Sequence, residues 1–252
     1  MSTNDTMFAD WVKANDGNIE NLHAKIEGGR TLIHYAAQDG RVDVLARLKE
    51  QGANVNARTD GDSTPLLYAA KNGHLDAMKW CIEQDAAVNV RNRFGWSPLH
   101  FATLNGQLDA MKLCIEHGAN VNVKTWPNGE AVIIGAIIHG NLDAMNLLMA
   151  NGTDMSIRDT SGQTLMHWAA KRNRVEAMQW LKEQGHGADI NARDNVGQLP
   201  MHGAALLNKL DAMKWLKENG ADINVKDNGG YTPLDCARMD EAKEWLLANG
   251  AK

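Results

Sequence analysis

The stretch Leu210-Asp211-Ala212-Met213-Lys214-Trp215 occurs five times along the chain in lightly edited form. The other copies begin at Leu75, Leu108, Leu142 and Val175, so the steps between copies are 33, 34, 33 and 35 residues. A fixed period of this length indicates supersecondary units stacked one on another. The apolar residues of each copy fall on one helical stripe, so each copy predicts a helix that packs against its neighbours.

A second pattern precedes each helix and predicts the start of another helix. Its members are residues 31–34, 64–67, 97–100, 164–167, 199–202 and 232–235, of the type Thr-Pro-Leu-His. A Thr or Ser side chain can cap a helix by accepting a hydrogen bond from the first turn. Proline fits the first helical position, where its missing N–H costs nothing. Each unit is therefore expected to hold two short helices, the second ending at a glycine such as Gly52, Gly118, Gly152 or Gly220.

Paired alanines such as Ala69-Ala70 and Gly-Ala-Asp-Ile-Asn endings such as residues 220–224 complete the pattern. With these features the chain resembles the ankyrin-repeat family over nearly everything from Arg30 to Lys252. The resemblance implies an all-α ankyrin-repeat solenoid of stacked helix-turn-helix units with β-turn fingers. It also implies that the motif histidines His34, His100, His167 and His202 make structural hydrogen bonds near the helix starts.

The period predicts the division of the chain. Residues 1–29 are expected to form a loose tail and a capping helix pair, with helices over Phe8–Ala14 and Ile19–Ile26. Residues 30–252 are expected to form one elongated domain of seven repeats with a shortened last unit. The predicted repeats are residues 30–60, 61–93, 94–127, 128–160, 161–195, 196–228 and 229–252.

Composition narrows the class of partner and the compartment. The net charge is −5 and the basic residues are spread out, which argues against nucleic acid as the main partner. No apolar run is long enough to cross a membrane, and residues 1–10 lack a secretory pattern, so we expect a cytoplasmic protein. Cys81, Cys114 and Cys236 are expected to be reduced, the first two as core residues.

The periodic side chains have structural explanations. The motif histidines would lie about a helix spacing apart, too far to share one metal ion. The methionines Met78, Met111, Met145, Met178 and Met213, with Trp80, Trp180, Trp215 and Trp245, are expected to pack between units. We find no phosphate loop, nucleophile motif or paired acid and base, so we predict no enzyme and no catalytic, cofactor or metal site. The finger asparagines Asn56, Asn89, Asn122, Asn191 and Asn224 resemble hydroxylated sites of some ankyrin proteins, but they also suit the turn.

The resemblance implies protein binding through the concave face and finger tips. The partner-binding residues that we predict are Arg93, Phe94, Trp96, Leu104, Trp126, Ile138, Lys171 and Arg172; Lys71, Leu206, Leu207 and Tyr231 share this face. Exposed aromatic residues on a rigid surface suit binding hot spots. The alternative is that Phe94 and Trp126 fold back onto neighbouring fingers.

The fourth unit departs most from the pattern, because residues 130–139 lack the Thr, Pro and His of the motif. Either drift in a central repeat or a tuned binding surface would account for this. Our leading hypothesis is a non-catalytic, monomeric scaffold that binds another protein. The alternatives are a regulator that covers the active site of a partner enzyme and an effector that acts in a host cell.

Overall fold

A computed structural model describes residues 3–15, 17, 21–185 and 189–252. The chain divides into two compact units, residues 1–123 and 124–252. We describe each unit by itself, and the expectation of one elongated domain stays a prediction. Within the described residues the secondary structure is helical, with isolated β-bridges but no strand, so the all-α prediction is confirmed.

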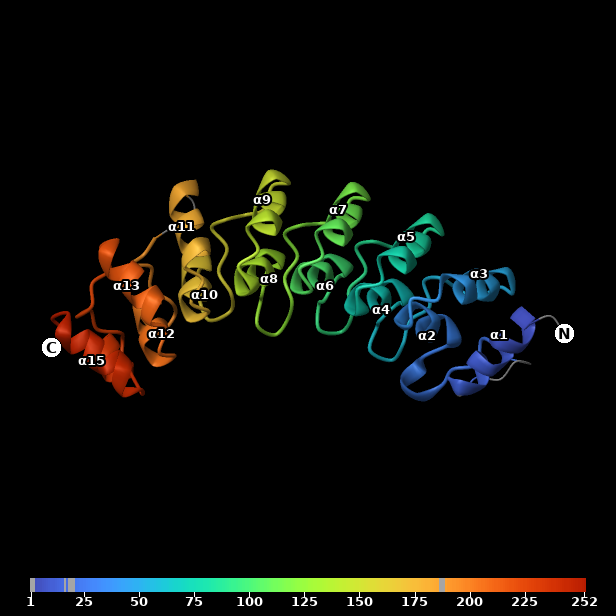
Figure 1. The fold of residues 1–252 in the computed structure, drawn as a ribbon, viewed down its shortest axis with the longest axis horizontal. Helices are drawn as coiled ribbons and strands as arrows, with labels where there is room; N and C mark the ends of the chain where they lie inside the picture. Colours follow the sequence, from blue (N-terminus) through green and yellow to red (C-terminus); the bar gives the residue numbers. More distant parts are fainter. Residues whose placement is uncertain (1–2, 16, 18–20, 186–188) are drawn as a thin grey trace. The chain divides into compact units, whose positions relative to one another are not determined.

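The first unit contains a terminal helix followed by three helix pairs (Figure 1). Its helices are α1 (Thr3–Ala14), α2 (Leu32–Gln38), α3 (Val42–Glu50), α4 (Pro65–Asn72), α5 (Leu75–Glu83), α6 (Pro98–Leu104) and α7 (Leu108–Glu116). The first helices of successive pairs, α2, α4 and α6, pack against one another. The second helices, α3, α5 and α7, do the same.

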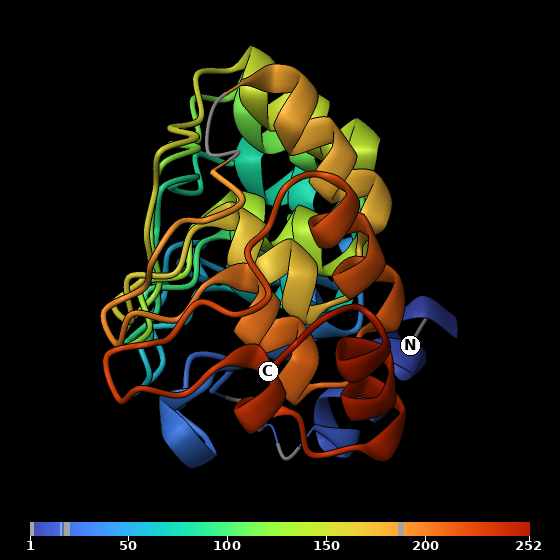
Figure 2. The same cartoon turned by 90° about the vertical axis from the view of Figure 1, so that its left-hand side faces the viewer.

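The second unit repeats this arrangement in four helix pairs. Its helices are α8 (Val132–His139), α9 (Leu142–Ala150), α10 (Leu165–Lys171), α11 (Val175–Gln184), α12 (Pro200–Leu206), α13 (Leu210–Glu218), α14 (Pro233–Cys236) and α15 (Asp240–Ala248). The helix α14 has one turn only. In each unit the loops that join one pair to the next project from one side of the helices (Figure 2).

The core of each unit consists of the small and flexible residues that the period predicts. The five periodic methionines and the paired alanines are fully buried. Cys81 and Cys114 are also buried, and burial raises the pKa of each thiol to about 12. Trp180 and Trp215 are buried, whereas Trp80 and Trp245 are half-buried. The helix-ending glycines have the left-handed conformation, as at Gly52 with φ of 90°.

The motif histidines join one repeat to the next. The Nδ1 atom of His34 accepts a hydrogen bond from the backbone N–H of Thr31 at 3.1 Å, so its Nε2–H donates to the carbonyl of Ala57 at 3.0 Å. His167 and His202 repeat both contacts, with the backbone N–H of their cap residues and with a carbonyl of the following finger. Because these rings are buried, each repeat fixes the backbone of the next through a neutral imidazole.

The fingers are hairpin-like turns held by backbone hydrogen bonds between residues four apart. An example is Asp194 N–H to the carbonyl of Gln198 at 2.9 Å. The fourth finger spans one residue more, because Thr125 N–H donates to the carbonyl of Glu130. The helix that follows this finger, α8, has no hydroxyl cap, because its N-cap residue is Ala131.

The finger asparagines make structural contacts. The side-chain amide of Asn89 donates to the carbonyl of Gly118 at 2.8 Å, and its oxygen accepts from the N–H of Asn120 at 2.8 Å. Asn56, Asn191 and Asn224 make the same pair of contacts with the following repeat. These contacts explain why asparagine suits the finger position without any modification.

The N-terminal prediction is wrong in one part. The first expected helix is present within α1, but Asn21–Ile26, the described part of the second, is not helical. The chain instead forms a short 3-10 turn over Glu27–Gly29, closed by the hydrogen bond from Ile26 N–H to the carbonyl of Arg30. Gly28 and Gly29 have positive φ and end any helix there. Residues 18–20 lie outside the described residues.

The buried histidines should make the stability depend on pH. Burial lowers the pKa of His34 from 6.5 to about 4, and burial also lowers the pKa values of His167 and His202. Unfolding releases these rings to bind protons, so acidification below pH 6.5 favours the unfolded state. Between about pH 7 and about pH 5, His34 alone should lower the free energy of unfolding by about 2 kcal/mol. Urea unfolding at the two pH values measures this.

The His34→Gln variant provides the control for this measurement, because glutamine does not titrate. It should lower the stability at pH 7 and should also show a weaker pH dependence than the wild type. An equal pH dependence in the two proteins, or a wild type that gains stability on acidification, would show that the ring is not neutral in the folded protein.

Candidate functional site

In the first unit, the predicted site residues of the third finger have unequal exposure. Phe94 is 54% exposed. Arg93 is exposed, and its guanidinium donates to the carbonyl of Asp60 in the preceding finger. Leu104 ends α6 and is half-buried.

Trp96 differs from the expectation of an exposed finger aromatic. Its ring stacks on Phe101, with centroids 5.3 Å apart and planes 17° apart, and its edge contacts His100. These contacts leave Trp96 half-buried. Trp96 therefore packs against α6 and helps to hold the finger on that helix.

In the second unit, Trp126 is 49% exposed in the fourth finger. Ile138 is half-buried near the end of α8. Phe94, Trp96 and Leu104 belong to the first unit, and Trp126 and Ile138 to the second. Their assembly into one patch stays a prediction.

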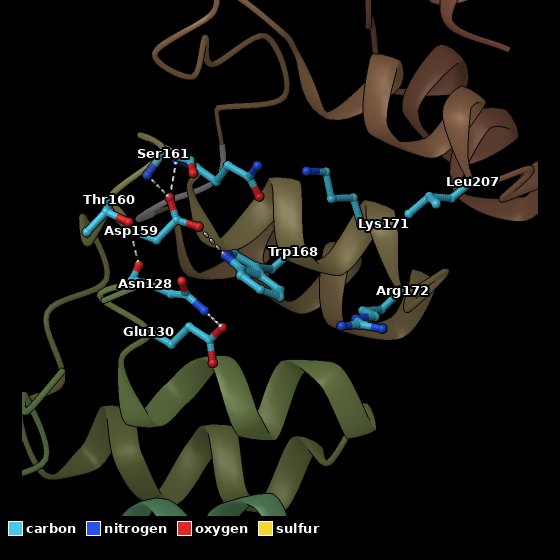
Figure 3. A pocket seen from close by; sticks show the side chains of 10 residues that line it. Asn128, Glu130, Asp159, Thr160, Ser161, Trp168, Lys171, Arg172 and Leu207 are labelled. Atoms are coloured by element: carbon cyan, nitrogen blue, oxygen red, sulfur yellow. Dashed lines mark hydrogen bonds between the residues drawn. The ribbon is translucent and has the colours of Figure 1, made fainter. Parts of the chain in front are cut away.

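The other two predicted residues, Lys171 and Arg172, line a pocket of about 340 Å³ within the second unit (Figure 3). The pocket lies between two fingers and the helix α10. Its lining residues are Asn128, Glu130, Asp159, Thr160, Ser161, Gln163, Trp168, Lys171, Arg172 and Leu207. Basic, acidic, amide and apolar side chains thus face one small space.

The fourth repeat lacks a ring at a position that is aromatic in each repeat of the first unit. In two repeats of the first unit, the residue before the helix cap stacks on the aromatic residue five positions later. The Arg30 guanidinium lies 3.7 Å from the ring centroid of Tyr35, and Trp96 stacks on Phe101. In the fourth repeat the corresponding residues are Glu130 and Gly135. Glu130 therefore has no ring to stack on, and its side chain borders the pocket.

Asp159 holds the wall of the pocket in place. Its Oδ1 atom accepts hydrogen bonds from the backbone N–H groups of Ser161 and Gln163, both at 2.9 Å. Its Oδ2 atom accepts the indole N–H of Trp168 at 3.0 Å. One carboxylate therefore fixes both the finger turn and the aromatic ring that faces the pocket (Figure 3).

Lys171 owes its position to a second glycine. A Cβ atom at Gly203 on α12 would lie 2.7 Å from Cε and 2.8 Å from Cγ of Lys171. The lysine stem thus lies across α12 at a place where Tyr35, Tyr68 and Phe101 stand in other repeats. The side chain is half-buried, and its burial lowers the pKa of the ammonium, while Asp194 and Asp159 act in the opposite direction.

The comparison with known proteins agrees with this architecture. A family model of ankyrin repeats, three copies in length, matches residues 33–125 and 132–227. The chain belongs to the ankyrin-repeat family. The crystal structure of the human ASB11 ankyrin repeat domain is similar, with a TM-score of 0.75 and 27% sequence identity. That match covers 88% of this chain and 99% of the other. No curated protein matches the chain.

Membership of this family bears on function in general terms. Ankyrin repeats are generally protein–protein interaction modules, and their fold is typically a non-catalytic scaffold. None of the helices in the described ranges is long and apolar enough to cross a membrane. Across the same ranges no three His, Cys, Asp or Glu side chains are placed to hold a metal ion.

The ankyrin pattern predicted Lys171, Arg172 and Leu207 as residues of the binding face, but it did not predict the finger residues that line the pocket. Asn128, Glu130 and Asp159 look like ordinary turn residues when only the sequence is considered. A signal for the pocket was present at the residue after the motif histidine. This residue is aromatic in most repeats but is a glycine at Gly135 and at Gly203. A ring position that loses its side chain in an ankyrin repeat marks a place where space can open.

The bond between Asp159 and Trp168 can be tested by Asp159→Asn. Asparagine keeps an oxygen for the N–H groups of Ser161 and Gln163, but its NH₂ group cannot accept the indole proton. The free energy of unfolding should fall by about 1 kcal/mol, since a partly buried donor loses its partner. Urea unfolding at neutral pH measures the change.

The matched control is Asp194→Asn in the next finger. Asp194 accepts the backbone N–H groups of Val196 and Gln198 through one oxygen, and no indole bonds to it. This variant removes the same charge and should cost clearly less stability than Asp159→Asn. Equal losses in the two variants would mean that the indole contact contributes nothing.

Proposed function

We propose that the chain is a non-catalytic scaffold that binds another protein through its fingers and first helices. In the second unit the proposed contacts are the pocket and the exposed Trp126, and in the first unit the exposed Phe94. The proposal needs no cofactor or metal ion. It refines the general role of ankyrin repeats by naming the surface.

The observation that carries the proposal is the mixed chemistry of the pocket. Trp168 and Leu207 offer apolar surface, and Leu207 is 46% exposed beside α12. Lys171 and Arg172 offer two cations that form no hydrogen bond or ion pair with the described part of the chain. Tryptophan and arginine, here Trp168 and Arg172, are enriched in interface hot spots.

The size of the pocket favours a protein side chain over a small ligand. At about 340 Å³ it lies near the lower end of ligand pockets, which range from roughly 300 to 1,000 Å³. Ligand pockets are mostly apolar, whereas polar and charged side chains form most of this lining. A space of this kind suits one or two side chains of a partner that also contacts the surrounding fingers.

Quantitative pull-down after cross-linking tests the proposal, with an extract of the cells that make the protein. Leu207→Ser removes exposed apolar surface at the pocket, and Gly135→Tyr restores the ring found at Tyr35 and Tyr68. Each variant should reduce capture of the principal partner by about tenfold or more, the effect of losing one hot-spot contact. Melting temperatures show whether the variants remain folded.

The matched control is Leu247→Ser on α15, since Leu247 is 57% exposed and lies on a second helix rather than a first helix or finger. It should leave capture unchanged. Capture that is lost in Leu247→Ser but kept in Leu207→Ser and Gly135→Tyr would place the binding surface elsewhere and reject the proposal.

A further inference from the structure

Two lysines at the same position of different repeats show what is special about the pocket. Lys71 follows Tyr68 by three residues, as Lys171 follows Trp168, and both stand at the end of a first helix. Lys71 is exposed, whereas Lys171 is half-buried. The aromatic position of the next repeat is Phe101 for Lys71 but a glycine for Lys171, so only Lys171 has room to lie against the following helix.

The ammonium of Lys171 has no directly bonded partner in this position, although the carboxylates of Asp194 and Asp159 act on it electrostatically. In the described part of the chain it forms no hydrogen bond and no ion pair within 4 Å. Figure 3 shows its nitrogen turned toward the finger side of the pocket. The carboxylate of Asp159 already accepts three hydrogen bonds, and its contacts are the finger turn and Trp168. A partly desolvated cation without a hydrogen-bonded partner gains from direct contact with an anion.

Arg172 adds a second cation on the rim. Its guanidinium carbon lies 5.9 Å from the ring centroid of Trp168, and it also forms no ion pair in the described residues. Lys171 and Arg172 thus enter one pocket from adjacent residues, with the indole beside them (Figure 3). Two cations next to an aromatic face and Leu207 are complementary to a carboxylate that has an apolar neighbour.

We infer that this pocket binds an aspartate or glutamate side chain of the partner protein, with an adjacent apolar side chain placed against Trp168 and Leu207. The inference rests on the proposed function and names the chemistry of its partner. Lys171 and Arg172 would bind the carboxylate. The amide groups of Asn128 and Gln163 can donate to neighbouring polar groups of the same peptide.

The other charges around the pocket favour one carboxylate over a polyanion. Glu130 and Asp159 border the same space, so the lining carries two acidic and two basic side chains. A nucleic-acid strand would bring successive phosphates against these carboxylates, and the whole chain has a net charge of −5. A single acidic side chain brings only one negative charge to the cations, so it meets less of this repulsion.

The experiment selects ligands from a phage-displayed library of random linear peptides against the full chain. The selected peptides should share an acidic residue next to an apolar one. Their affinities are then measured by fluorescence anisotropy for the wild type and for Lys171→Met. Methionine keeps the flexible stem on Gly203 but removes the charge, so binding should weaken by about tenfold or more.

Two further variants make the test specific. Lys71→Met removes the matching charge from the first unit and should leave the affinity unchanged. Lys171→Glu should bind poorly to the selected peptide but should recover affinity for a peptide whose acidic residue is replaced by lysine. This recovery in a charge exchange would not follow from a merely structural role of Lys171.

The outcomes separate this inference from the proposed function. Peptides that lose affinity in Leu207→Ser but lack an acidic residue, or that bind Lys171→Met as well as wild type, overturn the inference alone. Displacement of the peptide by a single-stranded DNA oligonucleotide at equal or lower concentration also overturns it. Selection of no peptide sensitive to Leu207→Ser or Gly135→Tyr overturns the inference and counts against the proposed function as well.

Discussion

The structure depends on hydrogen bonds that side chains of one repeat make to the backbone of the next. A short helix pair cannot bury its own polar loop groups, so the neighbouring repeat must satisfy them. Buried histidines such as His34 reach the next finger at one level of the repeat, and asparagines such as Asn89 reach the next helix end at another. These two contacts hold adjacent repeats in a fixed register. They require the same residues at the same spacing, and this requirement accounts for the period in the sequence.

The same constraint divides each repeat into positions that must be kept and positions that can vary. The histidine, the paired alanines and the methionine stripe are buried, and the histidine joins one repeat to the next. The residue before the cap and the residue after the histidine vary more in type, although they too can contact the next repeat, as Arg30 does with Tyr68. Arg30 with Tyr35, Trp96 with Phe101 and Glu130 with Gly135 occupy the same two positions with different chemistry. The chemistry at these two positions can therefore change while the histidine contact between repeats is kept.

This division also explains what the sequence could predict. The helix pairs, the buried methionines and the finger turns follow from repeated local signals, and each copy supports the others. The pocket follows from an absent ring at Gly135 and from the contacts of Asp159, which no periodic pattern records. The prediction of a second N-terminal helix was wrong for a related reason. The segment that contains Gly28 and Gly29 has no other copy in the sequence with which it could be compared. Trp96 was expected at the surface because its partner, Phe101, lies five residues away on the next helix.

The two glycines show how a specific site can form where an aromatic side chain is absent. Gly135 removes a ring and leaves Glu130 beside a space, and Gly203 removes another ring and lets Lys171 lie across α12. Neither change adds a functional group, yet the second lets a lysine lie partly buried against α12. Lys71, which has the same place in its own repeat, remains exposed because no such glycine follows it. The chemistry of the site is thus a property of the neighbouring repeat as much as of the residue itself, and residues of an ankyrin surface are best compared in consecutive pairs of repeats.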